Sequence, residues 1–375
     1  MVAGIYIHIP FCKQACHYCN FYFSTSLAQK DSLVNAIIRE VELRKDYLCG
    51  ETIETIYIGG GTPSLLTASE IKSILDAIHQ HHSSIALEEL TIEVNPDDLT
   101  LSKITELTSL KQYGLNRLSI GIQSFHEADL IYMHRAHSAI QSISAIKYAQ
   151  DAGFDLLTID LIYGTPTMDN EQWQANMAQA FELDIPHISA YALTVEPKTT
   201  LAHNIKTHKA LPVDEGRSSE QMDILMNAMA KQGYEQYEIS NFSKPNQYAV
   251  HNTNYWQGRK YIGIGPSAHS YNGSSRSWNV ANNSSYIKSI EMGIIPAEVE
   301  ILSSTNQANE YIMTSLRTMW GANLNHLSVV NYQFAILNAL KQIDPSFFTI
   351  EKNRLKLTQH GKHYADRIAS ELFTE

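Results

Sequence analysis

The sequence predicts an α/β fold in which repeated β-α units build a parallel sheet. Short runs rich in β-branched and aromatic residues alternate with longer helix-like stretches from the first residues to residue 240. Glycine and polar residues follow several of the strand-like runs, as they do where sites form at the carboxyl ends of parallel strands. Six such units in series fit either a barrel or a doubly wound sheet, and the alternation alone does not distinguish the two.

The predicted elements follow one another in regular order. Strands are expected at residues 5–9, 55–58, 90–94, 117–122, 156–162 and 188–193. Helices are expected at residues 31–48, 68–82, 102–113, 139–152, 170–183 and 214–232, where apolar residues recur at helical spacing. A stretch rich in Tyr, Asn, Gly and Ser covers residues 234–285. Residues 300–375 contain helical segments and a charged, hairpin-like run at 351–354, and we expect them to form a separate small domain.

Composition narrows the possible classes of protein. The chain has 375 residues, 44% of them hydrophobic and 18% charged, which favours a large buried core and argues against disorder. A net charge of −11 offers no basic field to a nucleic-acid backbone, so we expect no nucleic-acid partner. We also expect no transmembrane segment and no signal peptide, because the apolar runs are short and the start lacks the necessary pattern. These features predict a protein of the reducing cytoplasm.

Three of the four cysteines lie in one segment, Cys12-Lys-Gln-Ala-Cys16-His-Tyr-Cys19, directly after the first predicted strand. Three thiolates on one loop can bind a metal centre with one coordination position left open, since structural zinc sites and ordinary clusters usually take four protein ligands. A disulfide scaffold is disfavoured because three cysteines cannot pair among themselves. Zinc with His17 as fourth ligand is the main alternative, although His17 directly follows Cys16, which makes joint ligation awkward. We expect Cys49 to be a small buried hydrophobic residue.

The Cys-x3-Cys-x2-Cys spacing resembles that of the radical S-adenosylmethionine (SAM) superfamily. In that superfamily three thiolates hold a [4Fe-4S] cluster and SAM chelates the fourth iron. The resemblance implies an incomplete (β/α)6 barrel with its cluster at the carboxyl-end face, followed by a small C-terminal domain. From this resemblance, together with the order of predicted elements, we expect a barrel at residues 1–240, a barrel-associated segment at 241–299 and a separate C-terminal domain at 300–375.

A glycine-rich segment, Gly59 to Gly61 followed by Thr62, comes directly after the second predicted strand. Glycines let the backbone approach a ligand closely, although they would also suit a simple tight turn. In radical SAM proteins a segment at this place binds the SAM amino group. Polar residues near later strand ends are candidates for the same site, because a methionine moiety with a ribose needs carboxylate, amide and guanidinium partners: Glu93, Gln123, Arg135 and Asp160. Each could instead be a structural polar residue.

Longer motifs narrow the resemblance to the oxygen-independent coproporphyrinogen III dehydrogenase (HemN) group. They span residues 4 to 280 and include Tyr6-Ile-His-Ile-Pro-Phe-Cys12, Glu93-Val-Asn-Pro96, Gly121-Ile-Gln-Ser-Phe125, His134-Arg-Ala-His137, Asp160-Leu-Ile-Tyr-Gly164 and Tyr191-Ala-Leu-Thr-Val-Glu-Pro197. The resemblance implies that Tyr6 lies beside the cluster. It also implies that Gly60, Gly61 and Thr62 hold the methionine end of SAM and that the four polar residues contact its polar groups.

Two features distinguish this chain from the dehydrogenase. That enzyme has a further cysteine two residues after the third cysteine of the motif, where this chain has Phe21. It also carries an N-terminal extension, whereas here the first strand begins within five residues of Met1. Both differences weigh against dehydrogenase activity.

The segment His251-Asn-Thr-Asn-Tyr255-Trp256 matches the His-Asn-x-x-Tyr-Trp motif of the HemW haem chaperones. A neutral imidazole is a common haem ligand, and the two aromatic rings offer flat apolar surface to a macrocycle. The alternative is that His251 bonds a loop while Tyr255 and Trp256 pack in the core. His137 and His269 are secondary candidates for the haem ligand.

The combined observations predict a cytoplasmic haem chaperone with a SAM-ligated [4Fe-4S] cluster. It would accept haem and transfer it to recipient haemoproteins. One version of this hypothesis has respiratory proteins at the membrane as the recipients and the chaperone associated peripherally with the membrane. The main alternative is an enzyme that oxidatively decarboxylates coproporphyrinogen III through a 5′-deoxyadenosyl radical. A radical SAM enzyme with another substrate also fits, because the cluster motif specifies how a radical is initiated but not its target, and cleavage of SAM stays open.

Overall fold

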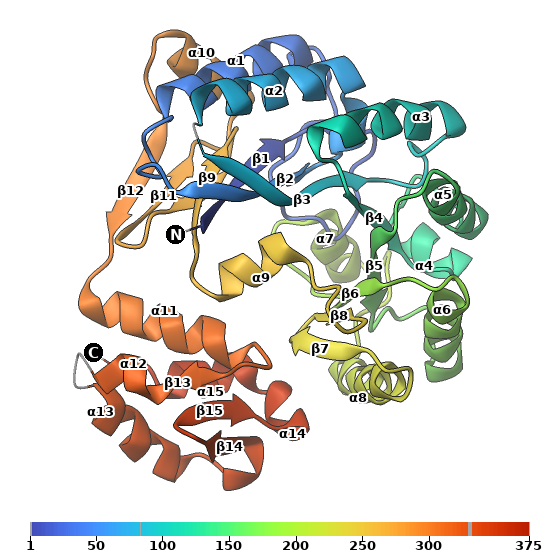
Figure 1. The fold of residues 1–375 in the computed structure, drawn as a ribbon. Coiled ribbons are helices and arrows are strands. Elements are labelled where there is room, and N and C mark those ends of the chain that lie inside the picture. The colour runs from blue at the N-terminus through green and yellow to red at the C-terminus, as the bar shows by residue number, and fades with distance from the viewer. Residues whose placement is uncertain (1, 83, 329–331, 375) are drawn as a thin grey trace.

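The central feature of the computed structural model is a curved sheet whose first six strands are parallel and lie in sequential order (Figure 1). The structure describes residues 2–82, 84–328 and 332–374. The six strands are β1 (Val2–Ile9), β2 (Thr52–Gly60), β3 (Ile85–Val94), β4 (Arg117–Gln123), β5 (Leu156–Tyr163) and β6 (His187–Ala192). Sequential order is that of a (β/α) barrel, since a doubly wound sheet reverses its strand order at a switch point. The predicted α/β fold is confirmed, and in the described chain β6 does not pair with β1, so the barrel is open.

Short strands extend both edges of this sheet. On one side β9 (Lys260–Ile264) pairs parallel with β1, and β10 (His269–Tyr271), β11 (Ser275–Asn279) and β12 (Ala297–Ile301) continue antiparallel. On the other side β8 (Asn241–Ser243) pairs with β6 and β7 (Glu235–Glu238) forms the edge. The Tyr-, Asn-, Gly- and Ser-rich stretch therefore belongs largely to the same sheet as the barrel.

Helices cover the outer face of the six-stranded sheet (Figure 1). Those on this face are α1 (Lys30–Leu43), α2 (Ala68–His81), α3 (Leu101–Ser109), α5 (Ala139–Asp151), α6 (Asn170–Glu182) and α8 (Glu215–Lys231). Helices α4 (Glu127–Tyr132) and α7 (Thr200–Lys206) instead bury Leu130 and Leu201 in a separate cluster. Capping boxes start three of the outer-face helices, at Thr67, Ser138 and Asp169, because these side chains satisfy backbone N-H groups of the first turn.

Helix α1 is shorter than predicted. It ends at Leu43, and the chain then turns until β2 begins. Cys49 lies in this turn with a positive φ of 53° and is exposed, so the prediction of a buried residue is wrong. The polar residues between Leu43 and Leu48 do not continue the apolar face of the helix, and the turn carries the cysteine out to solvent.

The strands alternate between two environments, and this alternation places the site. Along β1, for example, Ile5, Ile7 and Ile9 pack in the main hydrophobic core, whereas Tyr6 lines the inside of the barrel. The same period of two applies to the neighbouring strands, which direct these side chains inward: Tyr57, Thr91, Glu93, Thr158 and Asp160. Aromatic and polar residues within the strand runs are thus the inner wall of the barrel.

Residues beyond β12 form a second hydrophobic core. They comprise α11 (Ser304–Leu316), β13 (Ala322–Asn323), α12 (Leu324–Ser328), α13 (Tyr332–Ala339), β14 (Phe348–Glu351), β15 (Arg354–Leu357), α14 (Gln359–Lys362) and α15 (Ala365–Glu371). The predicted charged hairpin is confirmed as β14 and β15, joined by Lys352 and Asn353, which both have positive φ. Trp320 packs against Tyr237 and Tyr248 and so connects this core to the barrel.

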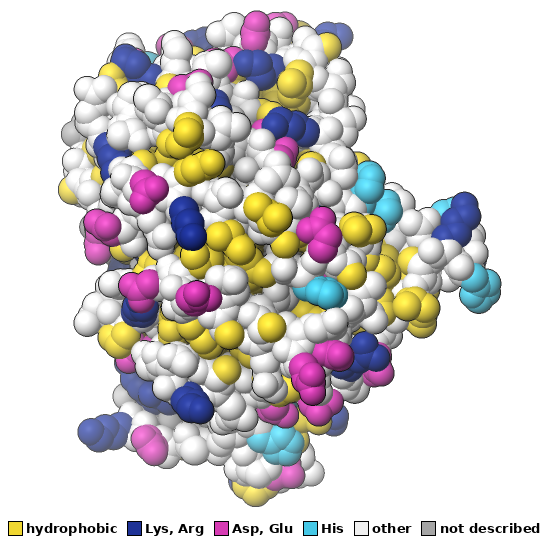
Figure 2. Space-filling view, turned by 90° about the vertical axis from the view of Figure 1, so that its right-hand side faces the viewer, with side chains coloured by type: hydrophobic (Ala, Val, Ile, Leu, Met, Phe, Trp, Pro, Cys, Tyr) yellow, Lys and Arg dark blue, Asp and Glu magenta, His cyan; other side chains and the backbone are white. Residues whose placement is uncertain are grey.

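Charges are dispersed over the surface seen in Figure 2. Lys and Arg side chains lie singly among acidic and apolar ones, so this face presents no concentrated positive patch. No helix in the described part of the chain is long and apolar enough to cross a membrane.

Candidate cofactor and ligand site

The cysteine loop follows β1 at the carboxyl end of the barrel and is fixed by backbone hydrogen bonds. The N-H of Cys12 donates to the carbonyl of Ser24 (3.0 Å), and the N-H of Ser24 donates to that of Pro10 (2.7 Å). The N-H of His17 donates to the carbonyl of Met133 (3.1 Å), which lies after β4. The loop is therefore held both to its own strand and to a neighbouring β-α connection.

Burial and one cation shape the chemistry of the three thiols. Burial is the main cause that raises the pKa of Cys12 to about 11, and it also raises the pKa of Cys19. The buried guanidinium of Arg135 donates from Nη1 to the Sγ of Cys16 at 3.2 Å. Without a metal the thiols of Cys12 and Cys19 hold their protons, and metal binding would displace those protons.

A zinc site that includes His17 receives no support from the geometry. The imidazole of His17 stacks on that of His134, with ring centroids 4.5 Å apart. Within residues 2–82, 84–328 and 332–374, no three His, Cys, Asp or Glu side chains converge on a position for a single metal ion. A [4Fe-4S] cluster makes a different demand, because each thiolate binds a separate iron of the cube.

A cavity of about 360 Å³ lies beside the cysteine loop, and we name it the cysteine cavity. It collects side chains from the ends of strands that are far apart in the sequence. The predicted residues that line it are Tyr6, Cys12, Cys16, Cys19, Gly60, Gly61, Thr62, Glu93, Gln123, Arg135 and Asp160. The structure thus brings together all the residues predicted for the cluster and SAM.

Gly60 and Gly61 allow the end of β2 to lie directly against the cysteine loop. A Cβ atom on Gly61 would lie 2.6 Å from the carbonyl oxygen of Phe11 and 3.0 Å from the Sγ of Cys12. Gly60 has a φ of 113°, which side chains disfavour, and a Cβ there would collide with His8. These glycines keep the space beside the thiols free of side chains.

Two carboxyl groups, those of Glu93 and Asp160, also line the cysteine cavity. Glu93 accepts hydrogen bonds from the N-H of Gly60 (2.9 Å) and the hydroxyl of Tyr57 (2.7 Å). Burial, assisted by the nearby charge of Asp160, raises the pKa of Glu93 to about 7. Burial likewise raises the pKa of Asp160 to about 6. Both groups therefore change charge near neutral pH, where a cationic ligand would favour their ionised forms.

A second cavity of about 650 Å³ continues into the barrel, and we name it the lumen cavity. It shares part of its wall with the cysteine cavity, including Tyr6, Glu93, Gln123 and Asp160. Its far end is formed by α9 (Val250–Trp256), through Asn252 and the two residues His251 and Tyr255. The volume lies within the range of cavities that bind small molecules and cofactors.

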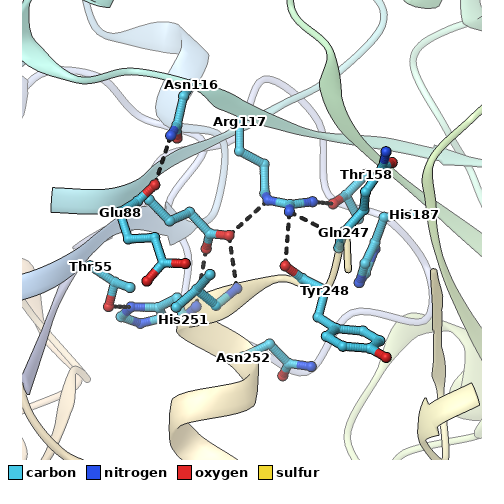
Figure 3. A network of polar contacts seen from close by, with 12 residues as sticks. Thr55, Glu88, Asn116, Arg117, Thr158, His187, Gln247, Tyr248, His251 and Asn252 are labelled. Atoms are coloured by element: carbon cyan, nitrogen blue, oxygen red, sulfur yellow. Dashed lines mark hydrogen bonds and ion pairs between the residues drawn. The ribbon is translucent and has the colours of Figure 1, made fainter. Parts of the chain in front are cut away.

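Helix α9 closes the amino end of the barrel, and a buried ion pair holds it there (Figure 3). Glu89 of β3 accepts hydrogen bonds from the N-H groups of Val250 (2.8 Å) and His251 (3.1 Å). Arg117 of β4 donates from Nε to Glu89 at 2.8 Å and from Nη2 to the carbonyl of Tyr248 at 3.1 Å. The pair therefore satisfies the backbone at both the start of α9 and the turn before it.

Comparison with known proteins identifies the family. The family model described as "Radical SAM superfamily" matches residues 6–180. "Heme chaperone HemW" of Bacillus subtilis (strain 168) is 34% identical over 322 residues, which cover 85% of this chain and 84% of that protein. The protein of the same name from Mycobacterium tuberculosis (strain H37Rv) is 30% identical over 374 residues, covering 98% of this chain and 94% of that protein. This chain belongs to the HemW family of radical SAM proteins.

A solved structure supports the fold assignment. Coproporphyrinogen III oxidase (HemN) from Escherichia coli, described as a radical SAM enzyme, aligns with a TM-score of 0.84 over 99% of this chain and 90% of that chain, at 20% identity. At this identity the likeness concerns the fold alone.

Membership of the radical SAM superfamily implies SAM and a [4Fe-4S] cluster, and the cysteine cavity fits both groups. Three thiols from one loop line it, and the glycines of β2 leave the adjoining space open. The Nε of Arg135 is buried there without a hydrogen-bond partner, so an acceptor of a bound ligand would satisfy it.

The residues of the His-Asn-x-x-Tyr-Trp motif lie in two different places: His251 and Tyr255 line the lumen cavity, whereas Trp256 does not. His251 is buried, with Nδ1 2.7 Å from the hydroxyl of Thr55 and Nε2 2.8 Å from that of Tyr255. Burial lowers the pKa of His251 to about 3, so the ring is neutral. Trp256 does not line the lumen cavity and instead lies beneath Arg317, 5.1 Å from its guanidinium carbon to the ring centroid.

The secondary histidine candidates lie outside the lumen cavity. His137 is buried with Nε2 3.0 Å from the carbonyl of Ile122, and His269 is exposed beside Trp278.

Several residues of this HemW-family site were missed by the sequence reasoning. Asn95 donates to the hydroxyl of Thr62 (2.9 Å) and accepts from Arg135 (2.7 Å), which links the glycine segment to the cysteine loop. Glu89 and Arg117, which hold α9, were also not predicted. A signal for the pair does exist, because charged residues at the start of two predicted buried strands need partners inside the protein.

Proposed function

We propose that this protein is a haem chaperone that binds haem in the lumen cavity and passes it to recipient haemoproteins, with a SAM-ligated [4Fe-4S] cluster in the adjoining cysteine cavity. The observation that carries the proposal is the position of α9, whose His251, Asn252 and Tyr255 line the lumen cavity, because this cavity shares part of its wall with the cysteine cavity. The names of the relatives, "Heme chaperone HemW", agree with it.

In the cysteine cavity, Cys12, Cys16 and Cys19 would hold the cluster, with Tyr6 beside it. Gly60, Gly61 and Thr62 would hold the methionine end of SAM, with Glu93, Gln123, Arg135 and Asp160 at its polar groups. When bound, the cluster can supply an electron to the sulfonium of SAM. The contribution of the protein is to orient the ligand, with carboxylates facing its cation and a guanidinium facing its carboxylate.

In the lumen cavity, His251 would supply a neutral imidazole to haem iron. Its Nε2 is engaged by Tyr255, so ligation requires the phenol to turn away and release that nitrogen. Trp256 would act through α9, because its ring secures the end of this helix against Arg317. Haem binding would therefore replace the His251–Tyr255 hydrogen bond with a bond from His251 to iron. Because the hydrogen bond can form again, the site can also release haem.

Haem titration of three variants tests this proposal. His251→Ala should lose the Soret shift of axial ligation, whereas Tyr255→Phe should keep it and bind haem at least as tightly, since the competing hydroxyl is absent. Trp256→Ala should weaken binding with the Soret position unchanged. Cluster content and melting temperature are measured first as controls. Wild-type affinity and spectrum in all three variants would exclude the α9 segment from haem binding.

The alternative function, oxidative decarboxylation of coproporphyrinogen III, is tested on the unsubstituted protein. Reconstituted protein is incubated with coproporphyrinogen III, SAM and reductant, and separately with haem. We expect haem to be retained and no protoporphyrinogen to form. Robust SAM-dependent protoporphyrinogen formation would establish the enzyme instead. Transfer of bound haem to an apo-haemoprotein, followed by absorption, then tests the chaperone step directly.

A further inference from the structure

We propose that His187 and Thr91 form a hydrogen-bonding subsite on the wall of the lumen cavity that receives a carboxylate side chain of the bound tetrapyrrole. This inference rests on the proposed haem binding and deepens it, because it assigns how one edge of the macrocycle is recognised. Neither residue belongs to the cysteine motif, the glycine segment or the His-Asn-x-x-Tyr-Trp segment.

Two buried polar atoms without partners motivate the proposal. Among the described residues, the buried side-chain atoms that have no hydrogen-bond partner include Nδ1 of His187 and Oγ1 of Thr91. Both residues line the lumen cavity, and they are 1% and 0% exposed. Buried polar groups are nearly always paired, so two unpaired atoms on residues that line one cavity point to a ligand that supplies the missing partner.

The hydrogen bonds around His187 determine which ring nitrogen carries the proton. Asn252 donates from Nδ2 to the hydroxyl oxygen of Tyr237 at 3.0 Å, and that oxygen lies 2.8 Å from Nε2 of His187. All three groups are satisfied when Tyr237 accepts from Asn252 and donates its own proton to Nε2. Burial, followed by the charge of Arg117, lowers the pKa of His187 well below its usual value, so the ring is neutral and has one N-H.

The remaining proton therefore lies on Nδ1, the atom that has no partner. A protonated Nδ1 cannot ligate iron, but it can donate to an oxygen of the ligand. Thr91 offers a hydroxyl donor from β3, whereas His187 belongs to β6, and both residues line the lumen cavity. Two donors favour a carboxylate, because its oxygens only accept hydrogen bonds. Haem carries its carboxylates as propionates at one edge of the ring.

Haem and haem dimethyl ester, in which both carboxylates are blocked, provide the test. We titrate both compounds into the reconstituted full-length protein and compare the ratio of their dissociation constants. His187→Leu should weaken haem binding at least about tenfold and leave ester binding within about twofold, as expected for loss of a hydrogen bond to a charged group. Thr91→Val, which keeps the shape of the side chain, should show the same pattern with a smaller effect. Tyr47→Phe is the control, because it removes a buried unpartnered hydroxyl that does not line the cavity.

The outcomes separate this inference from the proposed function. Equal loss of haem and ester with a shifted Soret band would make His187 an iron ligand and overturn the proposal. Unchanged binding of both compounds in both variants would also overturn it, since water would then suffice as partner. If His187→Leu fails to fold, the test uses Thr91→Val and the same ratio of the haem and ester dissociation constants. If the wild type binds neither compound, the proposed function fails with it.

Discussion

At the scale of single residues, the three thiols and Arg135 define the cluster end of the molecule. We expect alanine at position 12, 16 or 19 to abolish the [4Fe-4S] cluster, because each thiolate binds its own iron. Cys49→Ala is the matched control, since this thiol is exposed and lies outside the cysteine cavity. Iron, sulfide and visible absorption after anaerobic reconstitution measure the result. A cluster that is lost only in the Cys49 variant would contradict the assignment.

Glu93 gives a prediction of pH dependence. Its pKa of about 7 means that the carboxyl is largely protonated at pH 6 and largely ionised at pH 8. The ammonium group of SAM needs the ionised form, so the dissociation constant of SAM should fall as pH rises from 6 to 8, by at most about tenfold per pH unit. Calorimetry on the reconstituted protein measures this.

Two variants provide the controls for that measurement. Glu93→Gln should bind SAM weakly and without this pH dependence. Asp160→Asn removes a negative charge that raises the pKa of Glu93, so it should move the transition to lower pH. A flat profile in the wild type would remove Glu93 from the SAM site.

At the scale of elements, α9 depends on the Glu89–Arg117 pair. Both side chains are buried, and Glu89→Gln leaves a buried guanidinium without its counter-charge. We expect the free energy of unfolding to fall by about 3–5 kcal/mol. Asp76→Asn breaks an exposed ion pair with Lys72, and it should lower the free energy of unfolding far less. Urea unfolding measures the loss of stability in both variants. Equal losses would show that the buried pair does not stabilise the amino end of the barrel, which α9 closes.

Helices and strands with a strong hydrophobic period were predictable from the sequence. Short elements whose position depends on contacts with distant parts of the chain were not. All six parallel strands and six of the helices follow from alternation and helical spacing, because burial of a whole face leaves a pattern in the sequence. Helix α9 and the strands β7 to β12 are short, and their positions depend on partners distant in the chain. The residues that line the cysteine cavity were predictable from motifs at strand ends. For Glu89 and Arg117 the sequence indicates only that each needs a buried partner, and for His187 it indicates no role, since nothing local shows which inward residues meet across the barrel.

At the scale of the whole molecule, the two hydrophobic cores are separate, and aromatic, cation-π and polar contacts join them, including Trp320 against Tyr237, Arg317 over Trp256 and His363 with Asp223. We expect them to unfold in two steps. Hydrogen exchange in increasing urea should show amides of residues 304–328 and 332–371 losing protection before those of β1 to β6. Trp320→Ala should lower the first transition and leave the second unchanged, with Phe334→Ala, an exposed apolar residue, as the control. Simultaneous loss of protection would indicate a single cooperative unit.

The pairing of β1 with both β2 and β9 has a consequence for synthesis of the chain. One edge of β1 is covered once residue 60 has been made, but the other edge pairs with residues 260–264. At translation rates of 5–20 residues per second, the intervening chain takes roughly 10–40 s to emerge. During that interval an apolar strand presents an open hydrogen-bonding edge next to the cysteines, which favours mispairing between nascent chains. The slow emergence of β9, rather than low stability of the finished protein, would then limit the yield of folded protein. A folding chaperone that covers the open edge of β1 should raise this yield.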